Sequence, residues 1–79
     1  MSFMQNSLNP ELMTVPGIGR NTVDLLSRNG ITTTDHLVGQ YFLVDRDRVR
    51  FIEFLEEMGI RNVYAREITN ALGQKFDAM

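Results

Sequence analysis

The feature that most restricts the fold of this chain is a stretch with three glycines, between Val15 and Gly30. Gly17 and Gly19 form a turn, and the amphipathic segment that follows it ends at Gly30. This order is typical of a hairpin that leads directly into the start of a helix. Ile18, between the two turn glycines, is expected to point inward.

The backbone of this hairpin is suited to binding an anion. Glycine has no side chain, so an outside group can approach the turn closely. The free N–H groups of the turn and of the next helical turn, together with the helix dipole, make a phosphate-sized site. Arg20 favours this interpretation, because a cation at a helix N-terminus is unfavourable by roughly 0.3–1 kcal/mol unless an external anion completes the site. The alternative is a tight interhelical turn with a solvated Arg20.

The same stretch resembles the helix-hairpin-helix motif, a small element that binds DNA without sequence preference. The resemblance rests on the Pro-Gly-Ile-Gly run at residues 16–19, on Thr22, on the Leu25-Leu26 pair and on the closing Gly30. A dinucleotide-binding fingerprint is excluded, because no strand is predicted before the turn and Thr22 stands where the third glycine would be.

The length and composition of the chain restrict the kind of protein that it can be. Its 79 residues suffice for one small domain with a thin core, which dimerisation would supplement. The absence of cysteine excludes disulfides and thiolate zinc sites and fits an intracellular protein. No apolar run approaches the roughly 18 residues of a membrane span, so a soluble protein without membrane insertion is expected.

The net charge of −2 opposes nucleic-acid binding in general, since DNA-binding domains usually have a basic excess. Only a local group of basic side chains could attract DNA in a chain with this net charge. Four arginines lie at or near predicted helix starts and turns: Arg20, Arg28, Arg61 and Arg66.

Hydrophobic periodicity and capping residues predict an all-α fold of five helices. Residues 1–8 are expected to be a flexible tail, and residues 9–79 one helical DNA-binding domain with the helix-hairpin-helix at about 10–30. The predicted helices cover about residues 10–14, 20–29, 34–44, 47–58 and 63–76. Asn9 and Asn62 are the expected N-caps of the first and last of these.

The third predicted helix is too apolar for a small monomer to hide. Residues 37–44 are apolar on more than one face, so we expect part of this surface to contact another molecule. Gly39, in the middle of the helix, makes the helix about 1 kcal/mol less stable than alanine would. The close approach of another helix would explain a glycine at this position. The alternative is a central helix buried within the monomer.

Neither a catalytic group nor a metal or cofactor site is predicted. Glu53, Glu56 and Glu57 are expected to form a solvated face of the fourth helix, and the lone His36 to lie on the surface. No nucleophile, base and acid are grouped together, so we expect a protein that is not an enzyme.

From about Val15 to Ala78 the chain resembles the barrier-to-autointegration factor family. These are small, all-helical, homodimeric proteins of SAM-like fold that bind double-stranded DNA without sequence preference and bridge duplexes. The matching residues, in chain order, are Gly17-Ile18-Gly19, Gly30, Gly39-Gln40, Phe51 to Leu55, Leu72 and Asp77-Ala78.

The resemblance implies specific contacts. The hairpin and the start of the last helix would grip the DNA backbone through Gly17, Ile18, Gly19, Arg20, Asn21, Thr22, Asn62, Val63, Tyr64 and Arg66. The segment around Gly39 would form the dimer contact, with Gly39, Gln40, Phe42, Leu43 and Phe54. The two DNA sites of a dimer would face apart and hold two duplexes.

The resemblance also implies partners and a location. For a eukaryotic source, these would be LEM-domain proteins, lamins and histones, in the nucleus on chromatin and in the cytoplasm.

Several lysines of the family are replaced in this chain. They fall on Asp24, Leu25 and Val63, and Phe54 stands in for one of the family's tryptophans. Two alternatives therefore stay open. The first is a relative that has lost DNA binding and acts as a protein-interaction and dimerisation module. The second is a helix-hairpin-helix accessory domain of a DNA repair protein.

Overall fold

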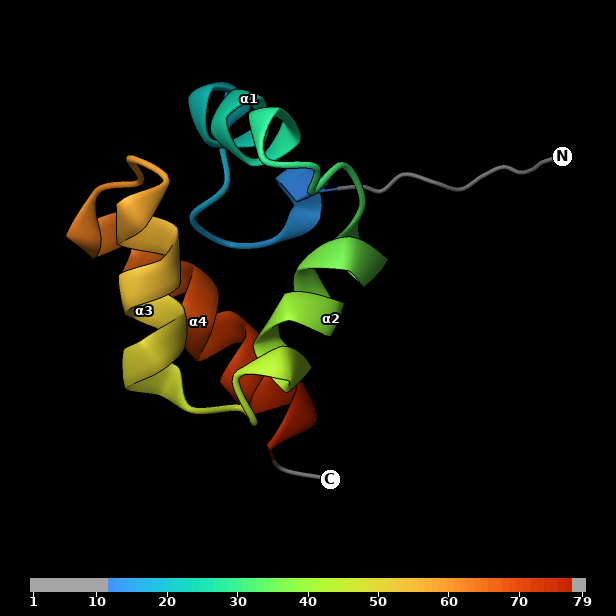
Figure 1. Cartoon of the computed structure of the whole chain (residues 1–79), viewed down its shortest axis with the longest axis vertical. Helices are drawn as coiled ribbons and strands as arrows, with labels where there is room; N and C mark the ends of the chain where they lie inside the picture. The colour runs from blue at the N-terminus through green and yellow to red at the C-terminus, as the bar shows by residue number, and fades with distance from the viewer. Residues whose placement is uncertain (1–11, 78–79) are drawn as a thin grey trace, which may run out of the picture.

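A computed structural model describes residues 12–77 of the chain. This part contains a 3-10 turn and four α-helices and has no strand, which confirms the all-α class. The elements in chain order are η1 (Leu12–Thr14), α1 (Arg20–Arg28), α2 (Thr34–Leu43), α3 (Arg48–Glu57) and α4 (Asn62–Phe76). In Figure 1, α3 and α4 form the main helix pair, α1 and the hairpin lie across one end, and α2 flanks α4 on the side away from α3.

The prediction of five helices is wrong for the part of the chain that is described. In place of the helix expected at about residues 10–14, Leu12–Thr14 forms a single 3-10 turn. The turn ends early because the Val15 N–H already bonds back to the Leu12 carbonyl, and Pro16 has no N–H to continue a helix. A complete helix-hairpin-helix is therefore not established. The expected cap Asn9, Pro10, the tail at residues 1–8 and Ala78 lie outside the described residues.

Side chains cap two of the helices and leave two uncapped. The Thr33 hydroxyl accepts a hydrogen bond from the His36 N–H at the start of α2, and Asp47 accepts one from the Arg50 N–H at the start of α3. No side chain caps α1 or α4. The prediction that Asn62 caps the last helix is wrong, because its side chain bonds to Glu56 and the N-cap position belongs to Arg61.

The core lies where the helices converge on the inner face of α4. Tyr41 and Phe51 meet edge to face, with ring centroids 5.1 Å apart, and both are fully buried. Ile18 is buried, as predicted from its place between the turn glycines. The other apolar core residues are Leu12, Val15, Leu26, Ile31, Leu37, Leu55, Ile60, Ala65, Ile68 and Leu72.

The C-terminal end of α4 is tied by polar contacts to α2, to the loop after α2 and to the start of α3. The Tyr41 hydroxyl donates a 2.8 Å hydrogen bond to the Asp77 carboxylate, and Arg48 and Arg46 lie 3.4 and 3.9 Å from the same group. The Arg48 guanidinium crosses α4 over Gly73, where any side chain would collide with it. Three elements therefore meet at one carboxylate.

The exposed surface of α2 contradicts the alternative of a helix buried within the monomer. Only Leu37 and Tyr41 of α2 are buried, whereas Leu43 is 77% exposed and Phe42 is 46% exposed.

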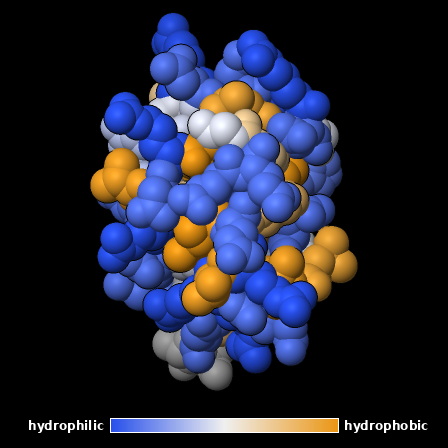
Figure 2. All heavy atoms as spheres, turned by 60° about the vertical axis from the view of Figure 1, so that its left-hand side comes forward, coloured by the Kyte–Doolittle hydropathy of each residue, from blue (hydrophilic) through white to orange (hydrophobic). Residues whose placement is uncertain are grey.

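Figure 2 shows a different side of the molecule, the one on which α3 lies. That face is mostly hydrophilic, and its hydrophobic side chains form separate groups. Glu53, Glu56 and Glu57 are exposed, as predicted.

Candidate nucleic-acid interface

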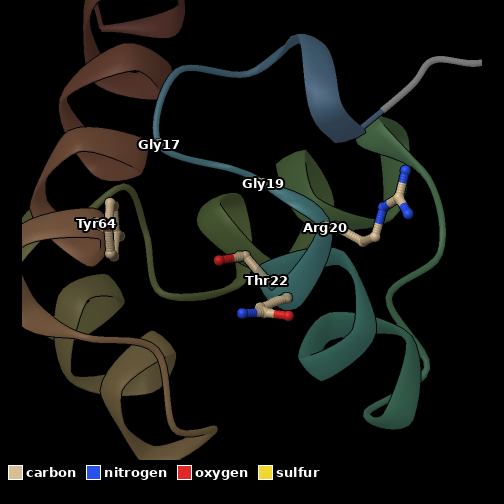
Figure 3. A pocket seen from close by; sticks show the side chains of 6 residues that line it. Gly17, Gly19, Arg20, Thr22 and Tyr64 are labelled. Carbon is tan, nitrogen blue, oxygen red and sulfur yellow. The ribbon is translucent and has the colours of Figure 1, made fainter.

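The hairpin before α1 and the first turn of α4 enclose a shallow hollow of about 280 Å³. Figure 3 shows the hairpin backbone crossing this hollow, with Tyr64 on the opposite wall. Its lining residues are Gly17, Gly19, Arg20, Asn21, Thr22 and Tyr64. The hollow therefore joins two segments that are more than 40 residues apart in the chain.

Gly17 holds the hairpin against α4. Its φ of +93° is a left-handed conformation that glycine adopts easily. A Cβ at this position would lie 3.1 Å from Glu67 Cβ and from Ile68 Cγ1, and 3.2 Å from the Tyr64 carbonyl oxygen. The hairpin backbone therefore lies directly on the first turns of α4, so both walls of the hollow have a fixed separation.

The start of α1 presents backbone donors to the hollow. Gly19 is the N-cap in an extended conformation, with φ −108° and ψ −169°, and no side chain caps the helix. The first bond into the helix runs from the Val23 N–H to the Gly19 carbonyl. Within residues 12–77, the N–H groups of Arg20, Asn21 and Thr22 have no acceptor. Such groups form an anion site at a helix N-terminus.

The start of α4 has the same character. Arg61 is its N-cap without a side-chain bond, and its first turn contains no acidic residue. The Tyr64 and Ala65 N–H groups bond to the Arg61 carbonyl, which leaves those of Asn62 and Val63 without an acceptor in the described part of the chain. The two uncapped helix starts of this fold are thus the two for which phosphate contacts were predicted.

The arginines fall into two groups according to their partners. Those remote from the hairpin, together with Arg28 at the end of α1, form ion pairs with carboxylates: Arg28 with Asp24, Arg46 and Arg48 with Asp77, and Arg50 with Asp47. The other group is exposed and has no ion pair within residues 12–77. It consists of Arg20, Arg61 and Arg66. The unpaired guanidinium groups therefore belong to the starts of α1 and α4.

Not every predicted contact residue lines the hollow. The Ile18 side chain is in the core, and Ile18 does not line the hollow. The Arg20 side chain points away from Tyr64, whereas the Thr22 hydroxyl points toward it (Figure 3). Val63 is exposed outside the hollow, and Arg66 lies about 200° around α4 from Tyr64, on a different face. Asn62 bonds to Glu56 at 2.8 Å.

The residues predicted for dimerisation lie in three places. Gly39, Gln40 and Leu43 line an open hollow on the exposed face of α2. Phe42 packs edge to face against Phe76, and Phe54 stacks on Phe51 within the same chain. The structure therefore brings three of these residues together on one surface and engages the two phenylalanines in intramolecular contacts.

Across residues 12–77 there is no cluster of three or more histidine, cysteine or acidic residues that could hold a metal ion. None of the helices in this range is long and apolar enough to span a membrane.

The chain is similar to a known protein family. A family model described as barrier to autointegration factor matches residues 2–79. The chain belongs to the barrier-to-autointegration factor family. The match covers nearly the whole chain, whereas the resemblance carried by individual residues begins at about Val15. No curated protein and no solved structure gives a significant match.

Two features of the barrier-to-autointegration factor fold in this chain escaped sequence reasoning. Arg61 is basic and near a predicted helix start but is not among the predicted contact residues, and no signal marked it as the N-cap, because arginine is not a residue type that favours this position. The bond between Asn62 and Glu56 had no signal, because the two residues belong to different helices whose packing decides their separation.

Proposed function

We propose that this protein binds double-stranded DNA through its phosphate backbone, without sequence preference. The observation that carries the proposal is a hollow lined by the uncapped start of α1 and by Tyr64, from the uncapped first turn of α4. The unpaired arginines Arg20, Arg61 and Arg66 lie at or near these two helix starts. Backbone N–H groups and guanidinium groups are the usual donors to phosphate oxygens. Membership of the barrier-to-autointegration factor family supports the same conclusion.

The lack of sequence preference follows from the kind of donors offered. Contacts to phosphate fix the orientation of a protein on the duplex but carry no base information. The interface consists of a glycine hairpin and two helix ends, and neither the hairpin nor a helix end projects a row of side chains that could read base edges in the major groove.

The proposal includes a homodimer that bridges or compacts DNA. A second copy would cover the exposed face of α2 at Gly39, Gln40 and Leu43, beside the part-exposed Phe42. Phe54, on α3, would join the contact only if the second copy also reached that helix. Two hairpins facing apart would then hold two duplexes. For a eukaryotic source, the family resemblance extends the proposal to LEM-domain, lamin and histone partners and to chromatin in the nucleus.

The direct test is titration of a labelled random-sequence duplex at several salt concentrations, read by fluorescence anisotropy. A handful of phosphate contacts per site predicts a log–log salt slope of roughly −3 to −5. Duplexes of different sequence should bind equally. No binding at low salt would reject the proposal and favour a protein-interaction module instead.

The variant Gly19→Glu tests the location of the site. Gly19 is extended, and apart from its chain neighbours no atom of residues 12–77 lies within 4 Å of its Cβ position, so glutamate fits the fold. Its carboxylate would stand beside the free N–H groups and repel phosphate, so we expect binding to weaken at least about tenfold. Gln74→Glu, at the exposed far end of α4, is the control for net charge and should have little effect. Equal loss in both variants would move the site away from the hairpin.

A further inference from the structure

A carboxylate lies beside the start of α4, where the proposed function places a phosphate. Asn62, the first residue of α4, donates a 2.8 Å hydrogen bond from its Nδ2 to Glu56 Oε2. Glu56 lies in the last turn of α3, and its side chain is exposed to solvent. The bond brings this carboxylate to the first residue of an uncapped helix.

This placement has two consequences for an incoming anion. Asn62 is one of the polar side chains at this helix start, and its amide group is already engaged by an internal carboxylate. In addition, a phosphate approaching the free N–H groups of Asn62 and Val63 meets a negative charge of the protein itself. The Glu56 carboxylate and a phosphate carry like charges and repel each other, and added salt screens this repulsion.

We propose that Glu56 lowers the affinity of the protein for DNA by acting as an internal anion at the α4 half of the interface. The inference rests on the proposed function and names a residue that sets the affinity of that same site. Glu56 thus acts on the interface through charge and through Asn62. It keeps the affinity of the interface below what the hairpin and the unpaired arginines would reach alone.

The test compares two charge-neutralising variants on one helix. Glu56→Gln removes the charge but keeps an oxygen that accepts the bond from Asn62. Glu53→Gln makes the same change one turn earlier on α3, at an exposed residue with no hydrogen bond or ion pair within residues 12–77. Both variants are titrated with the random-sequence duplex at low and at physiological salt, and their thermal unfolding is followed in parallel.

We expect Glu56→Gln to bind DNA about three- to tenfold more tightly than the original protein at low salt. Glu53→Gln should change the affinity less than about twofold, and the gap between the two variants should narrow as salt rises. The melting temperature of Glu56→Gln should stay close to that of the original protein, because the hydrogen bond is retained.

Three results would overturn the inference. Equal gains in both variants would show that only net charge matters, and no gain in Glu56→Gln would show that its carboxylate does not face the DNA. Weaker binding together with easier unfolding would give Glu56 a structural role in joining α3 to α4. Each of these leaves DNA binding by the original protein intact, whereas a failure of the original protein to bind at all would reject the proposed function itself.

Discussion

Tyr41 is the largest fully buried side chain among the described residues, and its hydroxyl depends on one partner. Burial raises its pKa above the ordinary value of 10.0, because the charged phenolate would lose its hydration. The hydrogen bond to Asp77 and the negative charge of that carboxylate raise the pKa further, and Arg48 opposes them. The folded protein therefore favours the neutral phenol.

This raised pKa predicts a loss of stability in alkaline solution. A group whose pKa is higher in the folded state contributes its full stabilisation below the unfolded value and loses it as pH rises through the folded value. The contribution of Tyr41 is thus complete below pH 10.0 and declines above it. Tyr41→Phe should lower the free energy of unfolding at pH 7 by about 1–2 kcal/mol, through the lost bond to a charged acceptor.

Urea unfolding of both proteins at pH 7 and above pH 10 measures this effect. The difference between the original protein and Tyr41→Phe should narrow in alkaline solution, since phenylalanine has no proton to lose. A difference that stays constant across this range would contradict the role assigned to the Tyr41 hydroxyl.

The hairpin and α4 form one unit because the backbone at Gly17 touches the helix. Alanine at this position would need a positive φ and would bring its Cβ to 3.1 Å from Ile68 and Glu67. We expect Gly17→Ala to lower the free energy of unfolding by about 2–4 kcal/mol, from the strained backbone and the overpacking together.

Gly19→Ala is the matched control for that change. Gly19 has an extended backbone and open space around its Cβ position, so alanine there should change stability by no more than about 0.5 kcal/mol. Chemical denaturation of the pair gives the comparison. Equal free energies of unfolding for Gly17→Ala and Gly19→Ala would show that the hairpin does not pack on α4 in solution.

In the whole molecule, the exposed face of α2 around Gly39 does not pack against another element of the monomer. Gly39 lies in the middle of α2, and within residues 12–77 no atom other than its chain neighbours and the nearby backbone of α2 lies within 4 Å of its Cβ position. Packing within the monomer therefore does not account for a residue that costs the helix about 1 kcal/mol relative to alanine. A contact with a second copy is the explanation that we propose.

Gly39→Glu should accordingly yield monomer or insoluble protein in light scattering, because a charged side chain would enter the contact between two copies. Gly39→Ala adds only a methyl group and improves helix propensity, so it separates the effect of charge and bulk from that of the helix itself. An unchanged dimer in Gly39→Glu would move the interface elsewhere.

Local chemistry explains which parts of the fold could be predicted. Thr33 caps α2, which was expected to begin at residue 34, and Asp47 caps α3, which was expected to begin at Asp47 itself. Apolar spacing predicted α2, α3 and α4 to within a few residues. The family was also identified correctly from a few glycines and aromatic residues. The errors occur where a local signal competes with a distant partner, as at Asn62, whose side chain bonds to Glu56 instead of capping its helix.

Most of the local structure follows from the sequence alone, because capping, turn formation and helical periodicity depend on residues a few positions apart. The hairpin, the inward Ile18 and the exposed cation at Arg20 belong to this class. Tertiary packing decided the rest. It set Tyr64 opposite the hairpin, and it paired Asp77 with Tyr41, Arg46 and Arg48. These contacts join residues about 30 or more positions apart, and only the packing of the hairpin on α4 and of α2 and α3 around α4 brings them within reach of one another.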